Sequence, residues 1–269
     1  MAVTSLDDWF AAKKQTLSYI KTATRTSVAY QKTSLIDLAG NPGAGTLAGT
    51  STASGVVPTD ATAGMIAIDA FDGGAKGYLG RVLAFSPVLG TIFLYDLLFK
   101  AGAYSYNANV NLTSQPAISG RCPDYSGGAT FGKGCQILYE QVTTATGNQA
   151  VTIGYTNSDG TGSRSTGSFS TGAAFAVGRC IIVPLQAGDF GVQKIDSVVG
   201  ATASAGTFNI LIVRPLAVLR IQVAAGTSWY DLVGSGMPEI YADSAIIPYF
   251  APDSTSTSTP ELLIDIISK

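Results

Sequence analysis

Apolar and polar residues alternate along most of this chain after residue 65, which is the spacing of strands with one buried face. In the clearest case Leu79, Arg81, Leu83 and Phe85 alternate with Val82 and Ala84. Similar stretches, enriched in β-branched and aromatic residues, are 91–100, 136–144, 151–155, 180–185, 192–199, 207–213, 217–224 and 262–267. The pattern predicts a mainly β fold, an antiparallel β-sandwich or jelly-roll.

The N-terminal segment follows a different pattern. Ser5 is a suitable helix cap, and Asp7 and Asp8 follow it where negative charge favours the first turn. The segment predicts one amphipathic helix over residues 5–27, with an apolar face made of Leu6, Trp9, Phe10, Leu17 and Ile20. This helix either packs on its own domain or docks on a neighbouring subunit.

Composition and spacing divide the chain into four parts. We expect an N-terminal helix or docking arm (1–30), a Gly/Ser/Thr-rich extended arm (31–64), a β-sandwich domain (65–252) and a C-terminal linker and strand (253–269). The last strand carries Leu262, Ile264 and Ile266, and it either completes its own sheet, the interpretation we favour, or augments the edge of a neighbour. With the five residues of the helix face, these three are the candidate subunit contacts.

Charged residues are scarce. The chain of 269 residues has no histidine, and only 13% of its residues are charged, against about 25% in an average soluble domain. Histidine is the usual general base near neutral pH, so we expect a protein that is not an enzyme, with no catalytic residues. A surface so poor in charge favours association, which predicts contacts with copies of itself or with other subunits.

Two motifs resemble binding sites but are incomplete. Gly127 to Lys133 matches GxxxxGK, yet Gly134 stands where a P-loop needs Ser or Thr. The run from Asn157 resembles the start of a calcium loop, but Ser168 stands where a closing Glu is needed, and the Asp159-Gly160 pair predicts a hairpin turn instead. We therefore expect no cofactor and no bound metal.

Other partners are disfavoured as well. The net charge of −2 and the lack of a basic stripe argue against nucleic acid. The most apolar stretch, 210–219, is too short for a membrane-spanning helix, and the first residues do not form a secretory signal. We expect the three cysteines to be small buried thiols, as in a protein folded in a reducing cytoplasm, and Asp96 to make a structural hydrogen bond.

Several segments, in this order, resemble a family of tailed-bacteriophage virion proteins described as structural, minor capsid or decoration-like: Asn41-Pro42-Gly43-Ala44-Gly45, residues 55–61, residues 94–99, residues 155–160, Pro184 to Val192, and residues 207–209 leading into Arg214-Pro215-Leu216. The resemblance spans residues 5 to 250 and implies a component of a virion assembled in a bacterial host cytoplasm. The resemblance leaves the head, the neck and the tail open as locations. Our own expectation is a subunit that stabilises the head through contacts with the major capsid protein and with copies of itself.

A second function from another class stays open. Tyrosine and tryptophan rings stack on sugars, and such residues occur near 104–111 and 229–231. This distribution is also compatible with a receptor- or glycan-binding β-module associated with a tail or fibre.

Overall fold

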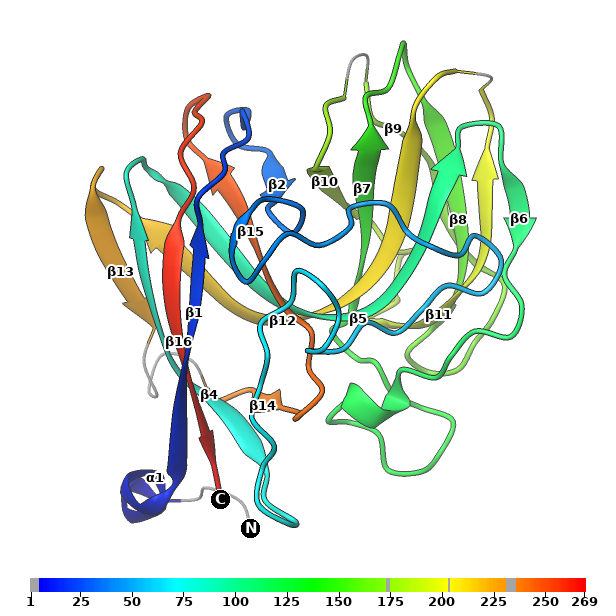
Figure 1. The fold of residues 1–269 in the computed structure, drawn as a ribbon. Helices are drawn as coiled ribbons and strands as arrows, with labels where there is room; N and C mark the ends of the chain where they lie inside the picture. The colour runs from blue at the N-terminus through cyan, green and yellow to red at the C-terminus, as the bar shows by residue number, and fades with distance from the viewer. Residues whose placement is uncertain (1–4, 173–174, 203, 231–235) are drawn as a thin grey trace. The chain divides into compact units, whose positions relative to one another are not determined.

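The computed structural model describes residues 5–172, 175–202, 204–230 and 236–269. The chain forms two compact units rather than the single sandwich expected over 65–252. Unit 1 comprises Met1–Thr46, Thr59–Asp96 and Leu216–Lys269, and unit 2 comprises Leu47–Pro58 and Leu97–Pro215. Both are built from antiparallel strands, so the predicted mainly β class is confirmed (Figure 1).

Unit 1 contains a large sheet in the order β13-β4-β16-β1-β3, with β14 pairing with the end of β4. A second group of strands places β15 between β2 and the first part of β5. The elements are α1 (Leu6–Ala11), β1 (Lys13–Lys21), β2 (Lys32–Ser34), β3 (Gly40–Asn41), β4 (Gly77–Ser86), β13 (Gly226–Tyr230), β14 (Glu239–Ile240), β15 (Ile246–Pro252) and β16 (Glu261–Ser268).

Unit 2 contains a four-stranded sheet in the order β6-β11-β8-β9, and β7 pairs with β10 on one side and with the first part of β12 on the other. Its own elements are β6 (Asn109–Asn111), the 3-10 helix η1 (Ser119–Arg121), β7 (Gln136–Thr143), β8 (Ala150–Asn157), β9 (Arg164–Ser170), β10 (Arg179–Val183) and β11 (Val192–Gly200). The predicted hairpin at Asp159-Gly160 joins β8 to β9, with Gly160 at a φ of 79°.

Two long strands belong to both units. β5 (Gly90–Ser105) crosses the unit boundary after Asp96, and β12 (Thr207–Ile221) crosses it after Pro215. The stretches 207–213 and 217–224, expected as separate strands, are mostly one strand, in which Pro215 is exposed. Each unit nevertheless has its own cluster of buried apolar side chains.

The N-terminal helix is much shorter than predicted. Ser5 caps it as expected, accepting a hydrogen bond from the Asp8 N–H at 3.1 Å, but the helix ends at Ala11 and β1 follows. In β1, Leu17 and Tyr19 are both buried, a spacing of two residues that marks a strand. Pairing with β16, about 250 residues further along the chain, overrides the helical spacing of Leu17 and Ile20.

The expected arm over 31–64 contacts its own chain. It contributes β2 and β3, and its buried residues include Leu35, Ile36 and Leu47. Residues 47–58 belong to unit 2, where Val56 and Lys100 form an isolated β-bridge. Most of the segment lacks regular secondary structure, so it is a set of surface loops rather than a projecting arm.

Candidate functional site

The predicted subunit contacts fall into two groups. Leu6 and Phe10 in α1 are 60% and 65% exposed, Ile20 in β1 is exposed, and Trp9 is half-buried beneath the Lys14 ammonium group. The other four, Leu17, Leu262, Ile264 and Ile266, are buried in the core of unit 1. Those four stabilise their own domain and leave the candidate docking set. β16 lies between β1 and β4, so the own-sheet placement that we favoured is confirmed.

Apolar side chains also lie on the outer side of the large sheet of unit 1. Cross-strand pairing aligns Trp229 with Leu83 and Leu83 with Leu263, and the next row aligns Thr227, Phe85, Glu261 and Ile20. Trp229 is 67% exposed and Leu263 39% exposed. We call Ile20, Leu83, Phe85, Trp229 and Leu263 the apolar face.

The apolar face has a hollow and a polar border. The hollow has a volume of about 170 Å3, and its apolar lining comprises Ile20, Leu83, Phe85, Leu262 and Leu263. The border is the row on the other side of Leu83 and Leu263 from Phe85. In this row Arg81 Nε lies 2.8 Å from Asp265 Oδ2, and Thr16 donates to Asp265 Oδ1 at 2.7 Å. An apolar patch with a polar rim is typical of surfaces that bind another protein.

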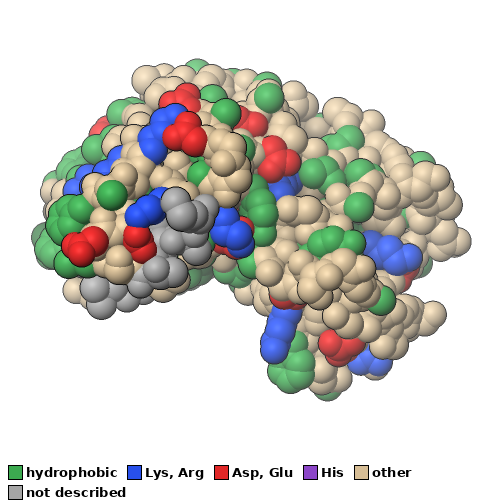
Figure 2. Space-filling model, turned by 90° about the horizontal axis from the view of Figure 1, so that it is seen from below, with side chains coloured by type: hydrophobic (Ala, Val, Ile, Leu, Met, Phe, Trp, Pro, Cys, Tyr) green, Lys and Arg blue, Asp and Glu red, His purple; other side chains and the backbone are tan. Residues whose placement is uncertain are grey.

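Charged side chains are scarce, and many of them form ion pairs. Lys76 lies 3.1 Å from Glu239, and Arg220 lies 2.5 Å from Asp253. Figure 2 shows one face of the molecule on which most of the visible surface is uncharged and several acidic side chains lie next to basic ones. Such pairs contribute little stability individually, but they leave a surface with little net charge to oppose association.

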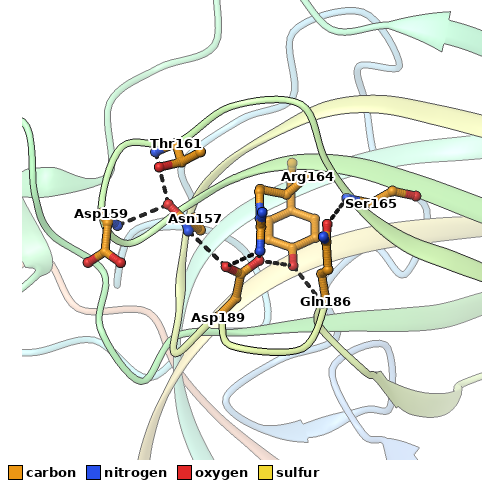
Figure 3. Close-up of polar contacts among 8 residues, drawn as sticks. Asn157, Asp159, Thr161, Arg164, Ser165, Gln186 and Asp189 are labelled. Carbon is orange, nitrogen blue, oxygen red and sulfur yellow. Dashed lines mark hydrogen bonds and ion pairs between the residues drawn. The ribbon is translucent and has the colours of Figure 1, made fainter.

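The most extensive polar network described in unit 2 centres on Asp189, in the loop between β10 and β11 (Figure 3). Its Oδ2 accepts hydrogen bonds from Tyr155 Oη at 2.5 Å and Arg164 Nε at 2.9 Å. Its Oδ1 accepts from Arg164 Nη2 and Asn157 Nδ2, both at 2.8 Å. The carboxylate therefore ties its loop to the hairpin of β8 and β9, and its side chain is only 2% exposed.

The protonation states within this network complement each other. Hydrogen bonds from Arg164 lower the pKa of Asp189 to about 2. Burial, helped by the bond to Asp189, raises the pKa of Tyr155 to about 12. The neutral phenol donates to Asp189 and accepts from the Gln186 N–H at 2.8 Å. With four hydrogen bonds to its two oxygens, the carboxylate acts as a clamp and is not available as a general base.

The incomplete motifs serve the protein's own backbone. In the Gly-rich loop, the Gly132 and Lys133 N–H groups donate to the Asp124 carboxylate at 3.0 and 2.9 Å, so an internal anion already binds them. Asn157 Oδ1 accepts from the N–H groups of Asp159 and Thr161, which shapes the hairpin turn. Among the residues that the structure describes, no group of three or more His, Cys, Asp or Glu could hold a metal ion.

Several single-residue predictions have clear outcomes. Asp96 is fully buried and accepts hydrogen bonds from Ser244 Oγ and the Ala245 N–H, both at 3.0 Å, as expected for a structural carboxylate. The alternative of a glycan-binding surface near 104–111 cannot use the rings of Tyr104 and Tyr106, because both are buried in the core of unit 2. The three cysteines, Cys122, Cys135 and Cys180, are all buried, as expected.

In the described ranges, no helix is both long and apolar enough to cross a membrane. Comparison of the chain with protein-family models, with curated proteins and with solved structures finds no match.

Proposed function

We propose that this protein is a non-enzymatic structural subunit of a tailed-bacteriophage virion. Its role is to decorate or clamp the capsid head by binding the major capsid protein and copies of itself. The resemblance of its sequence segments to virion proteins and the scarcity of charge support this proposal.

The apolar face carries the proposal. Fully burying a large apolar side chain stabilises a protein or a complex by about 1.5–3 kcal/mol. Trp229 is exposed and lies in one row with Leu83 and Leu263, so a partner that covered these side chains would be bound more tightly. The neighbouring edge strand β13 contains neither proline nor a charged residue, the usual means of preventing association at a sheet edge. Both features favour contact with another subunit.

The test is a charged substitution within the apolar face. Leu263→Glu places a carboxylate beside Leu83, and its matched control, Val199→Glu, changes an equally exposed strand residue in unit 2. We expect Leu263→Glu to reduce the number of copies in purified particles of the encoding phage by about tenfold, as for a residue central to an interface. Circular dichroism checks that both variants are folded, and quantitative mass spectrometry counts the copies. The proposal is contradicted if particles contain as many copies of the Leu263→Glu variant as of wild type, or if they contain no wild-type protein.

A further inference from the structure

A polar groove lies on the outer side of the four-stranded sheet of unit 2, away from the apolar core of that unit. Its volume is about 520 Å3, within the range of small-molecule sites. The floor of the groove is formed by one row of residues across the four paired strands: Asn111, Ser197, Gly154 and Ser165. Among the residues that the structure describes, the lining is Asn111, Thr152, Gly154, Thr156, Gly162, Ser163, Arg164, Ser165, Lys194, Asp196 and Ser197.

Glycine at position 154 keeps this floor open. A Cβ atom at that position would lie 2.4 Å from Ser197 Oγ, so any other residue there would displace the Ser197 hydroxyl group from its present position. The strand register also shifts at this point between Ile195 and Ser197, and Asp196 and Ser197 both line the groove. A bulge of this kind redirects side chains within a sheet.

The charges in the groove compensate each other. Lys194 Nζ lies 3.1 Å from Asp196 Oδ1, and Thr156 Oγ1 donates to Asp196 Oδ2 at 2.9 Å. The remaining cation of the lining, Arg164, forms its two hydrogen bonds with Asp189. The groove therefore presents no net charge to attract a phosphate, a sulfate or an acidic sugar.

Neutral hydrogen-bonding groups remain for a ligand. Within the described part of the chain, the side chains of Asn111, Thr152, Ser163 and Ser197 form no hydrogen bond with another residue. Hydroxyl and amide groups both donate and accept, as do the hydroxyl groups of a sugar. None of the described residues that line the groove has an apolar or aromatic side chain, so they give an apolar ligand nothing to pack against.

The Asp189 clamp holds one side of the groove in place. Arg164, which lines the groove, is held by both carboxylate oxygens of Asp189, and the adjacent Ser165 N–H donates to Gln186 Oε1 at 3.4 Å (Figure 3). A site that is already ordered loses less conformational entropy when it binds.

We infer that this groove binds a neutral saccharide through its hydroxyl groups. The inference does not depend on the virion proposal, because it concerns a different sheet in a different unit. Recognition by hydrogen bonds without aromatic stacking, in competition with water, predicts a dissociation constant on the order of millimolar.

The test is a nuclear magnetic resonance titration of the full chain with three neutral probes: cello-, malto- and chito-oligosaccharides. We expect at least one to give saturable shifts at the backbone amides of residues 152–156, 162–165 and 194–197. Inorganic phosphate is the charged comparison, and we expect it to leave these amides unshifted.

Two matched variants locate the site. Ser165→Tyr places a ring in the groove, and Ser170→Tyr makes the same change on the same strand but outside the lining. Both serine hydroxyls accept a hydrogen bond from the N–H two residues later, at 3.2 and 3.3 Å, so the local cost of the two changes is alike. We expect Ser165→Tyr to weaken saccharide binding about tenfold or more and Ser170→Tyr to leave it unchanged.

Three results would overturn the inference: no shift with any of the three oligosaccharides, equal shifts with phosphate, or equal binding by wild type and Ser165→Tyr. None of them bears on incorporation into particles, so the two proposals fail separately.

Discussion

Single residues decide how the polar groups of this protein are used. Asp189, Asp96 and Asp124 are all carboxylates in which both oxygens accept hydrogen bonds from the surrounding protein. A carboxylate engaged in this way orders loops and strand ends, which is a structural role. Few ionisable groups are present, and these three fix backbone geometry.

Asp189 gives this protein an identifiable sensitivity to acid. Its pKa is about 2 in the folded protein, whereas an unperturbed Asp titrates near 3.9. Since the folded-state pKa is the lower one, the stabilisation is present above about pH 4 and is lost as the pH falls towards 2. We expect Asp189→Asn to remove this contribution, so that unfolding of the variant takes up about one proton fewer than wild type in this window.

Urea unfolding measured from pH 5 to pH 2 checks this prediction. Asp159→Asn is the control, because the Asp159 carboxylate lies in the neighbouring turn and points away from Asp189 (Figure 3). Parallel pH profiles for wild type and Asp189→Asn would show that the clamp does not stabilise the folded state.

At the scale of elements, the sequence predicted strands where every second residue is apolar and buried. β4, β8 and β16 show this alternation over most of their length; in β16, Leu262, Ile264 and Ile266 are buried, with exposed Leu263 and half-buried Asp265 between them. The rule failed for β1, where Leu17 and Ile20 also fit a helix and the deciding contact is with β16 at the other end of the chain.

The surfaces were less predictable than the strands. Leu83, Phe85 and Leu263 alternate with core residues, but an apolar side chain on an outer strand face has the same sequence pattern as one in the core. The Asp189 network forms only because the turns at 157–161 and 187–191 lie next to each other in the folded chain. Each turn was visible in the sequence, but their meeting depends on strand pairing that local patterns do not specify.

The short α1 can be deleted without removing β1, which allows its role to be tested. No residue of α1 is buried, so removal of residues 1–11 should leave the protein folded, with a decrease in Tm of about 2–4 °C at most from the lost Lys14–Trp9 contact and Asp8–Lys269 ion pair. Removal of residues 1–21 also deletes β1, with Leu17 and Tyr19, and should prevent folding.

Thermal unfolding followed by circular dichroism distinguishes the two truncations. If α1 also contacts another subunit through Leu6 and Phe10, the 1–11 deletion loses copies from particles while remaining folded. A 1–11 deletion that fails to fold would show that α1 is part of the core, contrary to its exposure.

At the scale of the whole molecule, the main feature is that two apolar cores are built from one interleaved chain. The chain passes between the units after Thr46, Pro58, Asp96 and Pro215, and the last two crossings lie inside the continuous strands β5 and β12. No single linker separates the units. Loss of order in one unit should therefore propagate along both strands into the other.

The positions of the tryptophans allow this coupling to be measured. Both of them, Trp9 and Trp229, belong to unit 1, so their fluorescence reports on that unit alone, while far-ultraviolet circular dichroism reports on both. Ile153 is fully buried in the core of unit 2, and Ile153→Ala should cost about 2–5 kcal/mol there. If the units unfold together, the variant shifts the fluorescence and dichroism transitions to the same lower denaturant concentration.

Val199→Ala, a change at a partly exposed position of the same sheet, is the control and should shift neither transition appreciably. A fluorescence transition that stays in place while the dichroism transition splits would mean that unit 1 remains folded after unit 2 has unfolded. β5 and β12 would then tolerate a boundary between ordered and disordered backbone near Asp96 and Pro215. Coincident shifts would instead show that the strands crossing the boundary make the two cores one cooperative unit.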